Sequence, residues 1–234
     1  MMWTGNGVLS ETVSPRDLKS INEKLGRKVL IWWNYPVNDT MSDRMFLGPC
    51  EGLSADLDGS ISGLVSNPMN QGYASLAPLY TVAEYLWDTD GYDPDASLRR
   101  AAQFLYPECA QEFLVFADIM RASLINGDRS AFALSADINA YLDGSTDAAL
   151  IERLEQQMQA VSGALKTLKE KAGAEFIGEA GRFIAKAMAY ADNAGALFGL
   201  EKLALNDAGT SGEGRKAALA LYDTLSASRL TARS

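Results

Sequence analysis

The chain has 234 residues, two cysteines, no histidine and a formal net charge of −9. Apolar residues make up 47% and charged residues 22%, which is the composition of a folded globular chain and not of a disordered one. The lack of histidine removes Ser-His-Asp and Cys-His catalysis, His-based zinc sites and any imidazole acid or base. The acidic balance argues against a nucleic-acid-binding surface, because such a surface needs a basic patch.

Cysteine usage and hydropathy exclude further classes. Cys50 and Cys109 form neither a disulfide framework nor a C-x-x-C motif. No apolar run approaches the ~20 residues that span a bilayer. The segment Met1–Gly5 lacks the basic region of a signal peptide. We therefore expect no membrane span, no metal and no cofactor.

The composition changes along the chain. All seven prolines and all four tryptophans lie within the first 107 residues, after which Ala, Leu, Glu, Gln and Lys dominate. A proline-containing aromatic region followed by a proline-free region predicts an α/β part followed by an all-α part. We place the two predicted domains at residues 1–92 and 93–234.

The first part shows local helix and strand signals in turn. Ser14 and Pro15 predict the start of a helix, because serine caps helices and proline fits the first position, and Gly26 predicts its end. Lys28–Trp33 is a run of β-forming residues without alternation, which predicts a strand buried on both faces. Further strands are predicted at Met2–Trp3 and Ile61–Ser66, and a helix at Tyr73–Trp87. This order is typical of parallel βαβ units.

The second part shows helical periodicity. Two apolar stripes with steps of three and four residues predict two long helices whose stripes pack a core. The first stripe is Leu150, Leu154, Met158, Val161, Leu165 and Leu168; the second is Phe176, Ala180, Phe183, Ala187, Ala191, Ala194 and Phe198. Shorter helices are predicted around 113–124 and 218–225, with a loop at 206–214. The prediction is an antiparallel helical bundle.

Polar side chains gather where two predicted strands end. Trp32, Asn34 and Asp39 lie at and after the end of one strand, and Asn67 follows the next. The carboxyl ends of parallel strands are where ligand sites form, and aromatic rings with amides and carboxylates suit a sugar. Two interpretations stay open from these residues alone. In the second, which these residues alone favour, the tryptophans pack a core and the polar residues shape turns, as Asn67 before a proline would.

Five segments resemble one family in order and spacing. They are Met2-Trp-Thr-Gly5, Ile31-Trp-Trp-Asn-Tyr-Pro-Val-Asn-Asp39, Leu47-Gly-Pro49, Ser66-Asn-Pro-Met69 and Ala83-Glu-Tyr-Leu-Trp87. The family is glycoside hydrolase family 84, the β-N-acetylglucosaminidases that include O-GlcNAcases and hyaluronidase-like bacterial enzymes. The resemblance is strongest over residues 2–106 and continues more weakly through the helices.

The resemblance implies a fold and a mechanism. The family fold is a (β/α)8 barrel, which takes roughly 250 residues, so this chain would hold only its last strands and the helical bundle that follows. The family works by substrate-assisted retention, in which the substrate acetamido oxygen attacks the anomeric carbon with help from two adjacent aspartates. No Asp-Asp dipeptide occurs in this sequence. We therefore expect a fragment that lacks the catalytic pair and is inactive by itself.

The resemblance also implies roles for the four site residues. Asp39 would accept hydrogen bonds from sugar hydroxyls O4 and O6, and Asn67 would bond a ring hydroxyl. Asn34 would support the acetamido region, and Trp32 would form part of the pocket wall. The implied partners are an N-acetylglucosamine-containing glycan or glycoprotein and a missing N-terminal barrel segment. Localisation would depend on that segment, which would carry any signal peptide.

Two alternatives compete with parts of this interpretation. The chain could be a non-catalytic carbohydrate-binding or interaction module in which the helical bundle is the working part. The acidic segment Asp88–Asp95 faintly resembles a calcium loop, but it lacks the closing glutamate and the full spacing. We expect this segment to cap helices instead.

Overall fold

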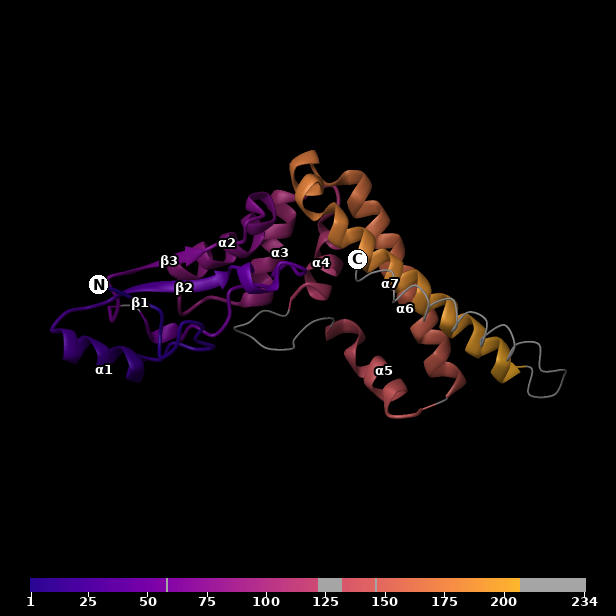
Figure 1. The fold of residues 1–234 in the computed structure, drawn as a ribbon, viewed down its shortest axis with the longest axis horizontal. Helices are drawn as coiled ribbons and strands as arrows, with labels where there is room; N and C mark the ends of the chain where they lie inside the picture. Colours follow the sequence, from indigo (N-terminus) through magenta and orange to yellow (C-terminus); the bar gives the residue numbers. More distant parts are fainter. Residues whose placement is uncertain (58, 122–131, 146, 207–234) are drawn as a thin grey trace. The chain divides into compact units, whose positions relative to one another are not determined.

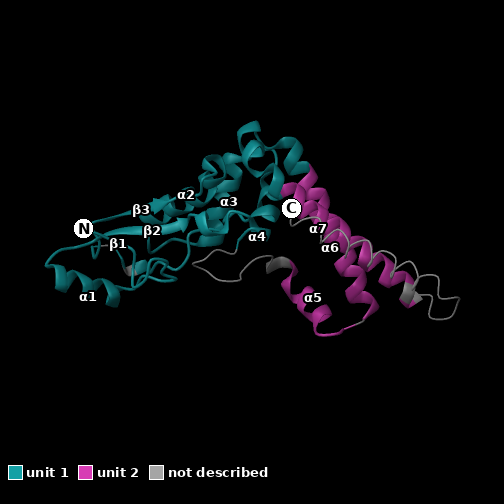
Figure 2. Ribbon diagram, in the orientation of Figure 1, with its two compact units in different colours: residues 1–131, 167–183 teal, residues 132–166, 184–234 magenta. Residues whose placement is uncertain are grey.

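The computed structural model describes residues 1–57, 59–121, 132–145 and 147–206 (Figure 1). They fall into two compact units, one drawn from residues 1–131 and 167–183 and the other from residues 132–166 and 184–234 (Figure 2). The units are groups of residues in mutual contact and do not by themselves define domains. The predicted domain boundary between residues 92 and 93 stays a prediction.

The first helix, α1, spans Pro15–Leu25. Ser14 and Asp17 form a reciprocal capping box at its start, which satisfies two backbone donors that the helix leaves unpaired. Gly26 ends the helix with a φ of 64°, a left-handed conformation that glycine adopts without steric cost. Both predicted ends of this helix are confirmed.

Three parallel strands make one sheet, in the order β1-β2-β3. β1 is Met2–Trp3, β2 is Leu30–Pro36 and β3 is Gly63–Asn67. Leu30 pairs with Met2 on one side and with Gly63 on the other, so the strands are aligned at their amino ends. Helix α2, Gly72–Trp87, follows β3. The predicted alternation of strands and helices in this part of the chain is confirmed.

The two faces of the sheet differ in burial. Ile31, Trp33 and Tyr35 of β2 are at most 3% exposed, whereas Trp32 is 37% exposed and Val65 of β3 is 39% exposed. Successive side chains of a strand point to opposite faces, so one face is packed and the other is open. The prediction of a strand buried on both faces is therefore wrong for the described residues.

The first unit also contains further helices and short turns. α3 is Pro94–Leu105, α4 is Ala110–Ile119, and one-turn 3₁₀ helices lie at Asp39–Met41 (η1) and Ala55–Leu57 (η2). After α3 and in α4, Tyr106 and Phe113 stack with their ring centroids 4.3 Å apart. Phe176 adds its ring to both, at 4.9 Å and 5.9 Å. This aromatic cluster therefore joins Phe176 to α4 and to the end of α3 within the first unit.

The second unit is built from α5 (Phe132–Leu142), α6 (Ala148–Lys171) and α7 (Ala174–Asn206), the last two of which contribute to both units. α6 and α7 run antiparallel. The start of α6 contacts the end of α7 through the ion pair of Glu152 with Lys202, and Ser162, further along α6, donates to Asp192, which lies earlier in α7. All six residues of the first predicted stripe are buried, as are all those of the second except the half-buried Ala194. Both long helices are confirmed. Leu124, the loop after residue 206 and the helix at 218–225 lie outside the described residues.

None of the helices in the described part of the chain combines the length and apolarity needed to cross a bilayer.

The aromatic cluster predicts a site in the first unit where truncation of a side chain strongly lowers stability. Phe113 is fully buried, so Phe113→Ala should leave a cavity and lower the free energy of unfolding by about 3–5 kcal/mol. Phe104→Ala is the matched control, because Phe104 is 74% exposed, and it should cost far less. Urea unfolding of both variants measures this. Equal losses would contradict the packing described here.

A second prediction concerns pH. The Arg100 guanidinium donates to Glu84 at 2.6 Å, and this bond lowers the pKa of the Glu84 carboxyl from 4.5 to about 2. A depressed native pKa stabilises the fold above pH 4.5, and that stabilisation is lost as the pH falls towards 2. Because the pair is partly solvated, the effect should be small. As the pH falls through this range, the midpoint temperature of thermal unfolding should therefore drop slightly more steeply for the parent chain than for Arg100→Gln. Parallel curves would contradict it.

Candidate functional site

The register between β2 and β3 breaks at the carboxyl end of the sheet. Trp33 pairs with Ser66, but the next pair is Pro36 with Asn67. Asn34 and Tyr35 of β2 therefore have no pairing partner on β3. Such irregularities re-aim side chains and are common next to functional sites.

Asn34 is the centre of a hydrogen-bonded group at this bulge. Its side-chain oxygen accepts from Trp32 Nε1 at 2.8 Å and from Asn67 Nδ2 at 3.0 Å. Its side-chain nitrogen donates to the carbonyl of Val8, in the loop after β1, at 2.7 Å. One amide thus connects the carboxyl ends of β2 and β3 with the loop after β1. The structure brings together three of the four predicted site residues.

Asp39 lies at the start of η1, in the loop after β2, and its side chain is exposed. Its Oδ1 accepts from Asn70 Nδ2 at 3.4 Å, and Asn70 belongs to the loop after β3. No hydrogen bond among the described residues joins Asp39 directly to the Asn34 group. The carboxylate therefore lies at the same edge of the sheet but is held by a different amide.

Two polar side chains below the site, Tyr35 and Cys50, are buried and neutral. Tyr35 donates its hydroxyl to the Gly48 carbonyl, and burial raises the pKa of that hydroxyl well above its usual range, so it stays protonated. Cys50 is 1% exposed. Burial raises the pKa of this thiol to about 12, so it is neutral and unsuited to nucleophilic attack.

The acidic segment before α3 caps that helix. Asp93 accepts from the backbone N–H of Ala96 at 2.7 Å, with Pro94 at the first helical position. Asp88 accepts from the backbone N–H of Gly91 at 3.0 Å. Across the described residues, no group of three or more Cys, Asp or Glu side chains is arranged to hold a metal ion.

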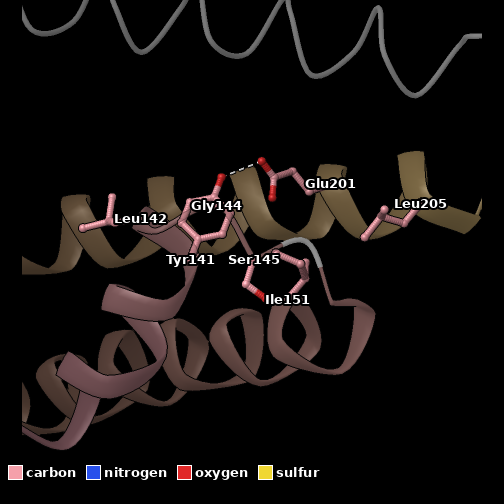
Figure 3. Close-up of a pocket in the computed structure, with 7 residues that line it drawn as sticks. All are labelled: Tyr141, Leu142, Gly144, Ser145, Ile151, Glu201 and Leu205. Atoms are coloured by element: carbon pink, nitrogen blue, oxygen red, sulfur yellow. Dashed lines mark hydrogen bonds between the residues drawn. The ribbon is translucent and has the colours of Figure 1, made fainter.

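A separate cavity of about 510 Å³ lies in the second unit (Figure 3). Its wall is mostly apolar, and it contains one hydrogen-bonded polar pair, in which the Tyr141 hydroxyl donates to Glu201 at 2.6 Å. The lining residues are Tyr141, Leu142, Gly144, Ser145, Ile151, Glu201 and Leu205. Its volume is within the usual range of small-molecule sites.

Sequence reasoning missed the residues that hold the strand-end loops. Asn38, Asn70 and Gln71 all belong to the polar segments after β2 and β3, but nothing in their spacing indicates that they contact one another. The only sequence signal is that each lies close to a predicted site residue. The Val8 carbonyl, which accepts from Asn34, has no sequence signal at all.

Comparisons with known proteins bear on this site. A family model described as β-N-acetylglucosaminidase matches residues 1–118. Protein O-GlcNAcase from Rattus norvegicus and from Mus musculus are each 29% identical over 85 residues, which is 36% of this chain and 9% of theirs. This chain therefore spans about a tenth of those relatives.

Solved structures share the fold over nearly the whole chain. CpGH84B has a TM-score of 0.83 and 26% identity, over 97% of this chain and 41% of its own. A Thermobaculum terrenum O-GlcNAc hydrolase mutant has a TM-score of 0.85 and 23% identity, over 100% of this chain and 50% of its own, and at that identity it shows the fold alone. Because the family model covers more than half of the sequence, this chain belongs to the β-N-acetylglucosaminidases of glycoside hydrolase family 84.

Proposed function

We propose that the chain is the C-terminal part of a retaining, substrate-assisted β-N-acetylglucosaminidase, and that its strand ends supply the hydroxyl-binding half of the sugar pocket. The observation that carries the proposal is the hydrogen-bonded group of Trp32, Asn34 and Asn67 at the carboxyl ends of adjacent parallel strands. Asp39 follows the same strand end. Ligand sites of barrel enzymes form at this edge.

Each of the four side chains contacts or supports a different part of the sugar. The exposed Asp39 carboxylate accepts from the outer hydroxyls O4 and O6, and charge-assisted bonds of this kind reject sugars that lack the hydroxyl. Asn67 bonds a ring hydroxyl, and Asn34 supports the acetamido region. The Trp32 indole, 37% exposed on the open face of the sheet, forms the apolar wall.

The catalytic acids come from a preceding barrel segment. This sequence contains no Asp-Asp dipeptide, and the mechanism needs one carboxyl as general acid and another to orient the acetamido group. The open sheet face, with Trp32 and Val65, is the surface that such a segment would cover. The substrate is then an N-acetylglucosamine-containing glycan or glycoprotein.

The second candidate function is a non-catalytic binding module with the helices as the working part. The cavity beside Tyr141 and Glu201 is the observation that supports it, because it combines an apolar wall with one polar pair.

The chain alone should release no chromogenic aglycone from a β-N-acetylglucosaminide at an enzymic rate. With a fused or co-expressed N-terminal segment that supplies the Asp pair, turnover should appear. In that assembly Asp39→Ala should lower kcat/KM by about a hundredfold, since two bonds to a charged group are lost.

Asp43→Ala is the matched control, because Asp43 is an exposed carboxylate in the same loop, and it should leave kcat/KM within about threefold. Turnover by the 234-residue chain alone that is lost in Asp39→Ala would contradict the proposal. It would mean that Asp39 is itself a catalytic acid.

A further inference from the structure

Asn38, the residue before Asp39, is buried while its neighbour is exposed. Its side chain is 1% exposed. Its Nδ2 donates to the Arg44 carbonyl at 2.8 Å and to Gln71 Oε1 at 3.1 Å, which uses both N–H groups of the amide. A buried amide costs free energy unless it is paired in this way, so these two bonds explain why asparagine is stable there.

The two bonds hold different parts of the site. The bond to Arg44 closes the loop 38–44, together with the backbone bonds from Met41 N to the Asn38 carbonyl and from Arg44 N to the Met41 carbonyl, both 2.9 Å. Asp39 lies inside this closed loop. The bond to Gln71 crosses to the residue that precedes α2, at the end of the loop that follows Asn67 and contains Asn70.

We propose that Asn38 is a positioning residue for sugar binding, which acts through Asp39. Its amide joins the loop after β2 to the loop after β3, and so holds the Asp39 carboxylate where Asn70 reaches it. Misplacing a binding group by about 1 Å is enough to weaken its contacts strongly. This inference rests on the proposed function of Asp39.

Asn22 provides a matched control at the opposite edge of the same sheet. Its Nδ2 donates to the Ser60 carbonyl at 2.8 Å, and its Oδ1 accepts from the Val29 N–H at 3.0 Å. It therefore joins the segments that lead into β2 and β3, as Asn38 joins the segments that leave them. Its loss removes a similar number of hydrogen bonds without touching the site.

The first test is a double-mutant cycle in the full 234-residue chain, with N-acetylglucosamine as the probe and NMR titration as the measurement. Asn38→Ala should raise Kd about tenfold, and Asn22→Ala should leave Kd within about twofold. Asn38→Ala combined with Asp39→Ala should bind no worse than Asp39→Ala alone, because the effect passes through Asp39. Additive losses would overturn the proposal.

Hydrogen exchange separates this inference from the proposed function, because it needs no ligand. The amides of Met41 and Arg44 should exchange faster in Asn38→Ala than in the parent chain or in Asn22→Ala. Unchanged exchange would overturn the role of Asn38 whatever the sugar does. If exchange is faster in Asn38→Ala but the parent chain binds no N-acetylglucosamine, the proposed function is overturned instead, and with it any role of Asn38 in sugar binding.

A milder variant keeps the test decisive if Asn38→Ala does not fold. Gln71→Met removes the acceptor of the crossing bond and leaves the bond to Arg44 intact. We expect Kd for N-acetylglucosamine to rise about threefold. In the Asp39→Ala variant, adding Gln71→Met should not raise Kd further. A Kd equal to that of the parent chain would overturn the proposal.

Discussion

The break in register between β2 and β3 is the constraint on which the candidate site depends. The two strands pair residue for residue from Leu30 to Trp33, and the pairing then skips to Pro36 beside Asn67. The two extra residues, Asn34 and Tyr35, have different roles. Tyr35 is buried and donates to the Gly48 carbonyl, while Asn34 accepts from the side chains of two neighbours. A single strand end therefore supports the core and also presents the site.

Side-chain amides hold loops at both ends of this sheet. Asn22 bridges the segments that enter β2 and β3, and Asn38 bridges the segments that leave them. Hydrogen bonds are directional, so each amide fixes the geometry of its loops more closely than an apolar contact would. The open face with Trp32 and Val65 has the opposite character, because its exposed side chains are apolar.

The sequence predicts features that depend on neighbouring residues and misses those that depend on distant ones. The helix Pro15–Leu25 is predicted to the residue, because its serine cap and terminal glycine are local signals. The strand predicted to end at Trp33 continues to Pro36, since a bulge depends on the partner strand. Burial of that strand on both faces is wrong for the described residues, because Trp32 is 37% exposed. The roles of the site residues came from the family resemblance, and the contact of Asn38 with Gln71 came only from the structure.

The most direct test of the account is where N-acetylglucosamine binds on the intact chain. In an isotope-labelled sample, the side-chain amide resonances of Asn34 and Asn67 should shift together along one saturable curve, with the Trp32 indole N–H. The side-chain amide of Asn22, at the other edge of the sheet, should stay unchanged. Shifts confined to residues around Tyr141 and Glu201 would contradict the account, and would assign sugar binding to the helical cavity instead.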